Sequence, residues 1–364
     1  MYQILTLNLG TTSSKVGLFH DEEIIDKRTI VHSNDEMVRY PTMEMQVQYR
    51  KDLILKWLDE IGESMGGIDA IGLRIGAALP QAVGGGTFLV EGELEKDILN
   101  NFIADQPLNH GMEITLPLAE EVSKGYDIPF YVVDPATINE LIPEAMISGH
   151  PLFVRDTMFH ALNQKMVARK IADEHLPKKY EECNMIIAHL GGGVSVSVHE
   201  KGRVIDTNNC GGEEGSFSPV RTGYLPVRQV IKLCYSGKYS REEALRLTMG
   251  KGGVLAYLGT SDMREVEKRI ETGDAYAELI YKAMAYRVAK EIGAGAAVLR
   301  GIIDAIIITG GIAKSRKFSE LIRDRVAAFA PVFIFPGDLE SEGLATGVLR
   351  VLRGEEQPQK YPKR

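Results

Sequence analysis

Hydrophobic and polar residues follow two different periods along this chain, and the changes of period predict its strands and helices. Val194–Val198 alternates apolar and small polar residues, which is typical of a half-buried strand. The apolar run Asn184–Ala188 predicts a buried strand before it. Between them lie Gly191, Gly192 and Gly193. Such a turn is either a hairpin that needs positive φ, or a loop whose backbone N–H groups approach a phosphate.

The N-terminal sequence repeats this pattern. When Ile4–Phe19 is laid over Ile186–Val198, the Leu-Gly pair at 9–10 coincides with the pair at 190–191. In both segments an apolar strand leads through Leu-Gly and a small-residue turn into an alternating strand, and a polar strand follows. The spacing predicts two halves of similar construction.

Two further apolar runs, Ile68–Gly76 and Ile302–Ile312, each end in glycine. The second is rich in β-branched residues, as expected for a strand that is buried on both faces. In open α/β sheets, ligands bind at the carboxyl ends of such strands.

Apolar residues at helical spacing predict helices between the strands. They cover Lys51–Ile61 and Leu279–Leu299, and a capping box of Asp262 and Glu265 predicts another helix over Met263–Ile270.

Length and composition indicate a protein of two domains. The chain has 364 residues, with 44% hydrophobic and 25% charged residues. No apolar run reaches the ~20 residues of a membrane span, and the N-terminus lacks the pattern of a signal peptide. Three scattered cysteines are expected to be reduced, so we predict a cytoplasmic protein without a membrane partner. The formal charge of −8 argues against a nucleic-acid partner.

Eight motifs carry a resemblance to a known family. In order they are Asn8–Lys15 (NLGTTSSK), Phe159–Lys165 (FHALNQK), Ala188–Val196 (AHLGGGVSV), Lys201–Asn209 (KGRVIDTNN), Phe217–Gly223 (FSPVRTG), Tyr257–Val266 (YLGTSDMREV), Ile308–Ala313 (ITGGIA) and Leu349–Glu356 (LRVLRGEE). Over residues 3–356 this order resembles the butyrate kinases, which belong to the acetate kinase family within the actin-like ATPase superfamily.

The resemblance implies an α/β fold of two duplicated actin-like ATPase (ribonuclease H-like) domains with an ATP cleft between them. Residues 1–134 plus 340–364 would form an N-terminal acid-binding domain, and residues 135–339 a nucleotide-binding domain. It also implies a homo-oligomer, a dimer or higher.

The implied reaction transfers the γ-phosphoryl group of ATP to butanoate, reversibly, and gives ADP and butanoyl phosphate. A carboxylate with a reference pKa of about 4.3 is already ionised at neutral pH, so the reaction needs no general base. Catalysis then consists of holding two anions in line and neutralising their charge. The implied cofactors are ATP/ADP and Mg²⁺, and the implied partners are a short-chain carboxylic acid and its acyl phosphate.

The same resemblance assigns phosphate-binding roles to two loops. In the first, Asn8 orients the transferred phosphoryl group. The residues lying against that group are Gly10, Thr11, Thr12, Ser13 and Lys15. In the second loop, His189 precedes Gly191, Gly192 and Gly193, whose N–H groups bind the ATP phosphates. Gly310 and Gly311 approach the adenosine. The alternative for the first loop is a plain hairpin with a solvated Lys15.

Charged residues complete the implied site. Arg74 and Arg221 match the two arginines that bind the substrate carboxylate and the phosphoryl group, a task suited to the planar guanidinium. His110 matches a histidine that stabilises the phosphoryl group, whereas His160 is expected to be structural.

Two acidic assignments remain open. Glu342 matches the carboxylate near Mg²⁺, with Glu340 as the alternative, since a shift of two residues exchanges them. Asp134 matches the active-site aspartate, with Asp156 as the alternative.

The chain departs from the butyrate kinase pattern mainly on the acid side. Ala77 and Ala78 stand where leucines are usual, and Glu113 lies in a segment that is normally uncharged. We hypothesise that the alanines enlarge the acid pocket and that Glu113 repels a carboxylate, which would shift the preferred acid. Alternatives are an acetate, propionate or branched-chain acid kinase, a relative that binds ATP without acid turnover, and an actin- or chaperone-like ATPase switch. A switch needs no paired arginines.

Overall fold

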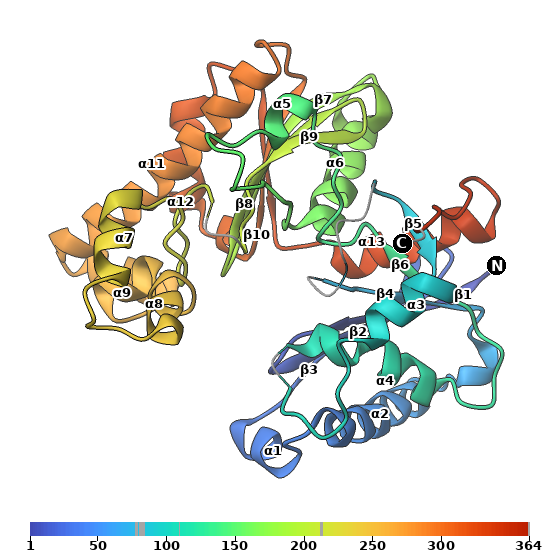
Figure 1. Cartoon of the computed structure of the whole chain (residues 1–364). Coiled ribbons are helices and arrows are strands. Elements are labelled where there is room, and N and C mark those ends of the chain that lie inside the picture. The colour runs from blue at the N-terminus through green and yellow to red at the C-terminus, as the bar shows by residue number, and fades with distance from the viewer. Residues whose placement is uncertain (77–78, 80–83, 109, 212–213, 363–364) are drawn as a thin grey trace. The chain divides into compact units, whose positions relative to one another are not determined.

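The computed structural model describes residues 1–76, 79, 84–108, 110–211 and 214–362. The chain forms two compact units, and each is built on a sheet of its own (Figure 1). Unit 1 comprises Met1–Asn139 with Leu339–Arg364, and unit 2 comprises Glu140–Asp338.

Unit 1 contains a six-stranded sheet in the order β3-β2-β1-β4-β6-β5. The first three strands form an antiparallel meander, β4 and β6 add in parallel to β1, and β5 closes the edge antiparallel to β6. The strands are β1 (Gln3–Leu9), β2 (Ser13–His20), β3 (Glu23–Val31), β4 (Ala70–Leu73), β5 (Thr87–Leu89) and β6 (Phe130–Val133).

Unit 2 repeats this plan in a five-stranded sheet of order β11-β10-β7-β8-β9. Another antiparallel meander is followed by β10 and β11, which run parallel to β7. The strands are β7 (Asn184–Leu190), β8 (Val194–Glu200), β9 (Arg203–Thr207), β10 (Ala305–Gly310) and β11 (Val332–Pro336). The predicted repeat is therefore present.

Helices flank both sheets. In unit 1 they are α1 (Asn34–Arg39), α2 (Met43–Glu60), η1 (Met65–Gly67), α3 (Gly92–Leu99), η2 (Gly111–Ile114), α4 (Thr115–Val122) and α13 (Glu340–Leu352). In unit 2 they are α5 (Pro143–Met146), α6 (Ala161–His175), η3 (Tyr180–Glu182), α7 (Val227–Cys234), α8 (Arg241–Thr248), α9 (Gly253–Leu258), α10 (Met263–Glu271), α11 (Ala275–Val298), η4 (Gly311–Lys314) and α12 (Arg316–Val326).

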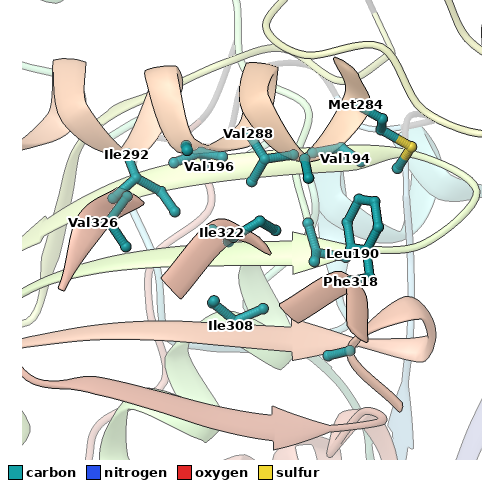
Figure 2. Close-up of a cluster of buried hydrophobic side chains, with 14 of the residues drawn as sticks. Leu190, Val194, Val196, Met284, Val288, Ile292, Ile308, Phe318, Ile322 and Val326 are labelled. Atoms are coloured by element: carbon teal, nitrogen blue, oxygen red, sulfur yellow. The ribbon is translucent and has the colours of Figure 1, made fainter. Parts of the chain in front are cut away.

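The core of unit 2 lies where α11 and α12 cover the sheet. Met284, Val288 and Ile292 project from α11 at intervals of four residues over Val194 and Val196 of β8 (Figure 2). Burying one such side chain contributes about 1.5–3 kcal/mol. This packing fixes β7 and β8, and with them the turn that joins the two strands.

Two helices differ from their predicted form. The α2 helix begins at Met43, eight residues before the predicted start, because the Thr42 hydroxyl accepts a hydrogen bond from Met45 N and caps it. Asp262 caps α10 as predicted, but Glu265 does not complete a capping box. Its carboxylate accepts a hydrogen bond from the Thr260 hydroxyl instead. None of the helices in the described part of the chain has the length and apolarity of a membrane span.

Candidate functional site

The first loop joins β1 to β2 at the end of a buried strand pair. Leu9 pairs with Ser14, and Gly10 N donates to Ser13 O at 2.8 Å. Asn8 lies just before the loop and is 4% exposed. The hairpin thus holds a buried polar side chain at the end of the central strand.

Three of the side chains named from the sequence, Asn8, Arg74 and Glu340, form a compact cluster beside this loop. Arg74 follows β4, and its Nη2 lies 3.2 Å from Glu340 Oε1 at the start of α13. Asn8 Nδ2 donates to Glu340 Oε2 at 2.7 Å, and Arg74 Nη1 donates to Asn8 Oδ1 at 3.4 Å. Lys15 Nζ lies 4.0 Å from Glu340 Oε2. Two cations and one amide therefore surround a single carboxylate that is 7% exposed.

The structure distinguishes the two candidate metal ligands, Glu340 and Glu342, by their contacts. Glu342 lies two residues after Glu340 in α13, and this spacing directs the two side chains to opposite faces of a helix. Glu342 Oε1 accepts a hydrogen bond from Lys27 Nζ at 2.6 Å, away from Asn8 and Arg74. Glu340, the alternative assignment, is the one that joins the cluster.

Sequence analysis missed Arg50, a buried residue of α2 that contacts the first loop. Its guanidinium donates to Gly10 O at 2.8 Å and to Thr11 O at 2.7 Å. Burial lowers the pKa of Arg50 to about 10. One signal was available: Arg50 falls between Val47 and Ile54 at the spacing of the buried face of the helix.

The predicted His110 caps the short helix η2, which packs against the first loop. Its Nδ1 accepts a hydrogen bond from Met112 N at 3.2 Å, and Glu113 accepts one from His110 N at 3.1 Å. A Cβ atom at Gly111 would lie 2.3 Å from Gly10 O, so glycine is required there. Glu113 thus has a local role in capping.

The acid-pocket hypothesis also named Ala77 and Ala78. Both lie outside the described residues.

The two candidate aspartates lie in different units. Asp134 follows β6 in unit 1, is 3% exposed, and accepts a hydrogen bond from Gly86 N at 2.7 Å. Its φ of +39° is uncommon for a residue other than glycine, and such conformations gather at functional sites. Asp156 lies in unit 2, where it accepts a hydrogen bond from Asn209 Nδ2 at 2.5 Å.

The second loop, between β7 and β8, is closed by its own backbone. Gly191 N donates to Gly193 O at 3.0 Å, and the Ser218 hydroxyl donates to Gly192 O at 2.6 Å. A Cβ atom at Gly193 would lie 2.9 Å from Arg221 Nη1, and Arg221 also donates to Cys210 O. The third glycine therefore lets a guanidinium approach the loop.

Two histidines stack at the head of this loop. The rings of His189 and His160 lie 3.8 Å apart and within 7° of parallel. Asn163 Nδ2 lies 2.8 Å from His189 Nδ1, and Ser195 Oγ lies 2.8 Å from His160 Nδ1. His160, predicted to be structural, is thus a direct neighbour of a predicted site residue.

A pocket of about 780 Å³ adjoins the second loop within unit 2. Gly191, Gly192 and Gly311 line it, and a Cβ atom at Gly311 would meet nothing within 4 Å. Gly310 has φ +96°, and a Cβ atom there would lie 2.4 Å from Leu190 O. The two glycines named for adenosine therefore differ: Gly310 allows close packing of the backbone, and Gly311 faces open space.

The pocket is also lined by residues that sequence analysis did not assign to the site. Asp262 at the start of α10 binds Arg264 through Nε at 2.9 Å and Nη2 at 2.7 Å, and these hydrogen bonds lower the pKa of Asp262 to about 2. Glu267 Oε1 accepts hydrogen bonds from Tyr281 Oη at 2.5 Å and from Ser315 Oγ. Asp262 lies in the motif Tyr257–Val266, but only contacts between distant segments of unit 2 show that it lines the pocket.

The Mg²⁺ ion that the family resemblance implies would need few protein ligands. Among the described residues, no group of three or more His, Cys, Asp or Glu side chains could hold a metal ion. Mg²⁺ bound to a nucleotide commonly takes one or two protein carboxylates, with phosphates and water as its other ligands. The buried carboxylate of Glu340 fits that limited role.

Comparisons with known proteins agree with one another. A model described as the Acetokinase family matches residues 112–341. Among solved structures, a Porphyromonas gingivalis acetate kinase matches with TM-score 0.78 at 18% identity, over 97% of this chain and 100% of that one. An Entamoeba histolytica acetate kinase matches with TM-score 0.74 at 17% identity, over 95% and 98%. A Francisella tularensis propionate kinase gives 0.73 at 18%, over 95% and 99%. The predicted two-domain, actin-like ATPase fold is confirmed.

Proposed function

The chain belongs to the acetokinase family, and we propose that it is a kinase that phosphorylates butanoate with ATP. Membership makes it a phosphotransferase with a carboxyl acceptor. The identity of the acid and the roles of individual residues are our proposal. The observation that carries it is the cluster of Asn8, Arg74 and Glu340 beside the first loop.

We assign the nucleotide to the 780 Å³ pocket of unit 2. The Gly191 N–H donates to Gly193 O within the loop, so the backbone N–H groups of Gly192 and Gly193 are the ones that bind the phosphates. His189, held by Asn163, fixes the head of that loop. Gly311 leaves room for the nucleoside, while Gly310 keeps the strand against Leu190.

We assign the transferred phosphoryl group to Asn8, Lys15 and residues 10–13, with His110 beside them. Arg74 and Arg221 bind the phosphoryl group and the acid carboxylate, because each can form two parallel hydrogen bonds to an anion. The acid attacks as an ionised carboxylate, so no residue removes a proton from it. Asp134 is proposed as the active-site aspartate, supported by its burial and its positive φ.

We assign Mg²⁺ to Glu340 rather than to Glu342. When bound, Mg²⁺ neutralises phosphate charge that would otherwise repel the incoming carboxylate. Glu340 supports this because its carboxylate lies in the cluster, whereas Glu342 is paired with Lys27. Glu340→Gln is expected to raise the Mg²⁺ concentration needed for half-maximal rate more than Glu342→Gln does.

The choice of butanoate rests on the motif resemblance. Acetate or propionate is the alternative, supported by the names of the solved relatives. Relative kcat/KM for acetate, propionate, butanoate, hexanoate and branched acids decides between them. A maximum at butanoate supports the proposal, a maximum at acetate or propionate overturns the acid assignment, and a broad maximum among larger acids supports the altered pocket.

An ATPase switch makes a different prediction. A kinase releases ADP in proportion to added acid, whereas a switch hydrolyses ATP regardless of which acid is present. Measuring ADP release with and without butanoate separates the two. From the resemblance we also propose that the protein is a homo-oligomer and acts in the cytoplasm.

A further inference from the structure

Arg50 is an unusual residue to find fully buried. It lies in the middle of α2 and is 1% exposed. Its guanidinium makes four hydrogen bonds: Nη1 to Gly10 O at 2.8 Å and to Ser14 Oγ at 3.2 Å, Nη2 to Thr11 O at 2.7 Å, and Nε to Gln46 Oε1 at 3.1 Å. Three of these four bonds reach the first loop and the start of β2.

All four acceptors are neutral. They are two backbone carbonyls, one hydroxyl and one amide, and among the described residues no carboxylate forms an ion pair with Arg50. A buried charge is costly unless it is paired, so the hydrogen bonds satisfy the guanidinium but leave its charge unbalanced. An anion bound at the loop would balance it.

The two carbonyl contacts determine how the loop presents its N–H groups. A trans peptide unit is planar, and its C=O and N–H groups point in opposite directions. Since Gly10 O and Thr11 O point toward Arg50, the N–H groups of Thr11 and Thr12 point away from it. Successive N–H groups directed to one side form an anion-binding surface.

His32 supports the next peptide unit in the same way. Its backbone N–H donates to Thr12 O at 2.9 Å, and its Nε2 lies 2.9 Å from Ser14 Oγ. Three consecutive carbonyls, from Gly10 to Thr12, are therefore held from the interior of unit 1. Gln46, which orients the Arg50 side chain, is itself fixed by donating to Tyr40 O at 2.7 Å.

We propose that Arg50 is a positioning residue for phosphoryl transfer. It holds the first loop so that the N–H groups of Thr11 and Thr12 face the transferred phosphoryl group, and it adds a positive charge behind them. This inference rests on the proposed function, because that proposal assigns the first loop to the phosphoryl group. Arg50 acts through the loop and does not touch the substrate.

The test compares Arg50→Lys and Arg50→Met with Ile54→Ala in the full-length protein. Lysine keeps the charge but lacks the planar fork that reaches two carbonyls. Ile54 lies one turn further along α2, is fully buried, and has no role in the proposal. The melting temperature of each variant is followed by the fluorescence of Trp57, the one tryptophan in the chain, which is also in α2.

We expect kcat to fall by roughly 10²-fold in Arg50→Met and by about tenfold in Arg50→Lys, since displacing a preorganised anion-binding loop by about 1 Å has effects of this size. The KM for ATP is expected to change less than threefold, because the nucleotide pocket lies in unit 2. Affinity for MgADP with aluminium fluoride and butanoate, a mimic of the transferred phosphoryl group, should fall in parallel with kcat. Ile54→Ala should lower the melting temperature and leave kcat unchanged.

Wild-type levels of kcat in both Arg50 variants would overturn the proposal. An equal loss of kcat in Ile54→Ala would also overturn it, since the effect would then follow from stability alone. Failure of the proposed function has a different result: the wild-type protein itself would form no acyl phosphate from any acid.

Discussion

The two loops share one backbone plan and are held in different ways. Each joins two antiparallel strands after a Leu-Gly pair, with Leu9 opposite Ser14 in one and Leu190 opposite Val194 in the other. The second loop consists of glycines, and its outer contacts come from Ser218 and Arg221. The first loop keeps its side chains, and a buried arginine holds its carbonyls from within.

Under the proposed function, the two loops present backbone N–H groups to phosphate in two different ways. Glycines have no side chains, so an anion or a guanidinium can come close to the backbone. A run of glycines is also easy to recognise in the sequence. In the first loop, a buried donor binds the peptide carbonyls from the interior and so orients the peptide units. The loop residues themselves form no distinctive motif. The first arrangement is visible in a motif, and the second is visible only in the structure.

The largest effect on kcat is expected from removing Arg221, whose guanidinium lies against Gly193 of the second loop. Arg221→Ala should lower kcat by roughly 10³-fold, because the charged, bidentate anion contact that we propose for Arg221 would be lost. Arg228→Ala, which removes an exposed charge from α7, serves as the control. Steady-state kinetics with saturating ATP and butanoate measure the effect, and similar losses in both variants would contradict the assignment.

The first loop can be disturbed from outside through η2. Gly111→Ala would bring a Cβ atom to 2.3 Å from Gly10 O, a backbone atom that cannot move without moving the loop. We expect kcat to fall by roughly 10²-fold, as for other displacements of about 1 Å near a reacting group. Gly149→Ala, where a Cβ atom meets nothing within 4 Å, should retain full activity. Full activity in both variants would show that the loop position is unimportant.

The same substitution in the second loop should have a smaller effect. At Gly193 the new Cβ atom would lie 2.9 Å from Arg221 Nη1, the far end of a flexible side chain that can shift. Gly193→Ala should therefore lower kcat by about tenfold, less than Gly111→Ala. The reverse order in parallel assays would contradict the comparison of the two loops.

A last prediction concerns stability in acid and involves His32, which supports the first loop. Burial, with a smaller contribution from the Arg50 charge, lowers the pKa of His32 from 6.5 to about 4. Between these values the unfolded chain binds more protons than the folded one, so stability falls as the pH drops from 6.5 toward 4. At about 1.4 kcal/mol per pKa unit, the loss at pH 4 is about 3 kcal/mol.

Urea unfolding at pH 7.5 and pH 5 measures this dependence. His32→Gln should weaken it by the contribution of His32. The dependence that remains in His32→Gln is expected to come partly from His199, whose burial lowers its pKa to about 3. An unchanged dependence in His32→Gln would contradict a neutral, buried His32.

The fold could be predicted where the pattern is local. Alternation after the glycine turn predicted β8, the β-branched run predicted β10, and the repeated Leu-Gly pair predicted two units of one plan. These features depend on residues that are neighbours in sequence. The predicted start of α2 is too late, because Gln46 and Arg50 are polar residues on its buried face and hide the helical pattern there.

The site was harder to predict from the sequence than the fold, because its contacts join segments that are distant in the chain. Arg50 meets a loop about 40 positions earlier in the chain, and His160 meets His189 from another element. Glu340 and Glu342 cannot be distinguished by motif, since only the orientation of α13 decides which one faces Asn8. No local pattern carries that information.

Hydroxamate trapping of acyl phosphate, formed from MgATP and each acid from acetate to hexanoate, tests the central claim most directly. Wild-type protein and Arg221→Ala are compared at equal concentration. Acyl hydroxamate that is most abundant with butanoate and absent in the variant is the predicted result. No hydroxamate from any acid, from a wild-type protein that still binds ATP, would contradict the assignment of this chain as a carboxylate kinase.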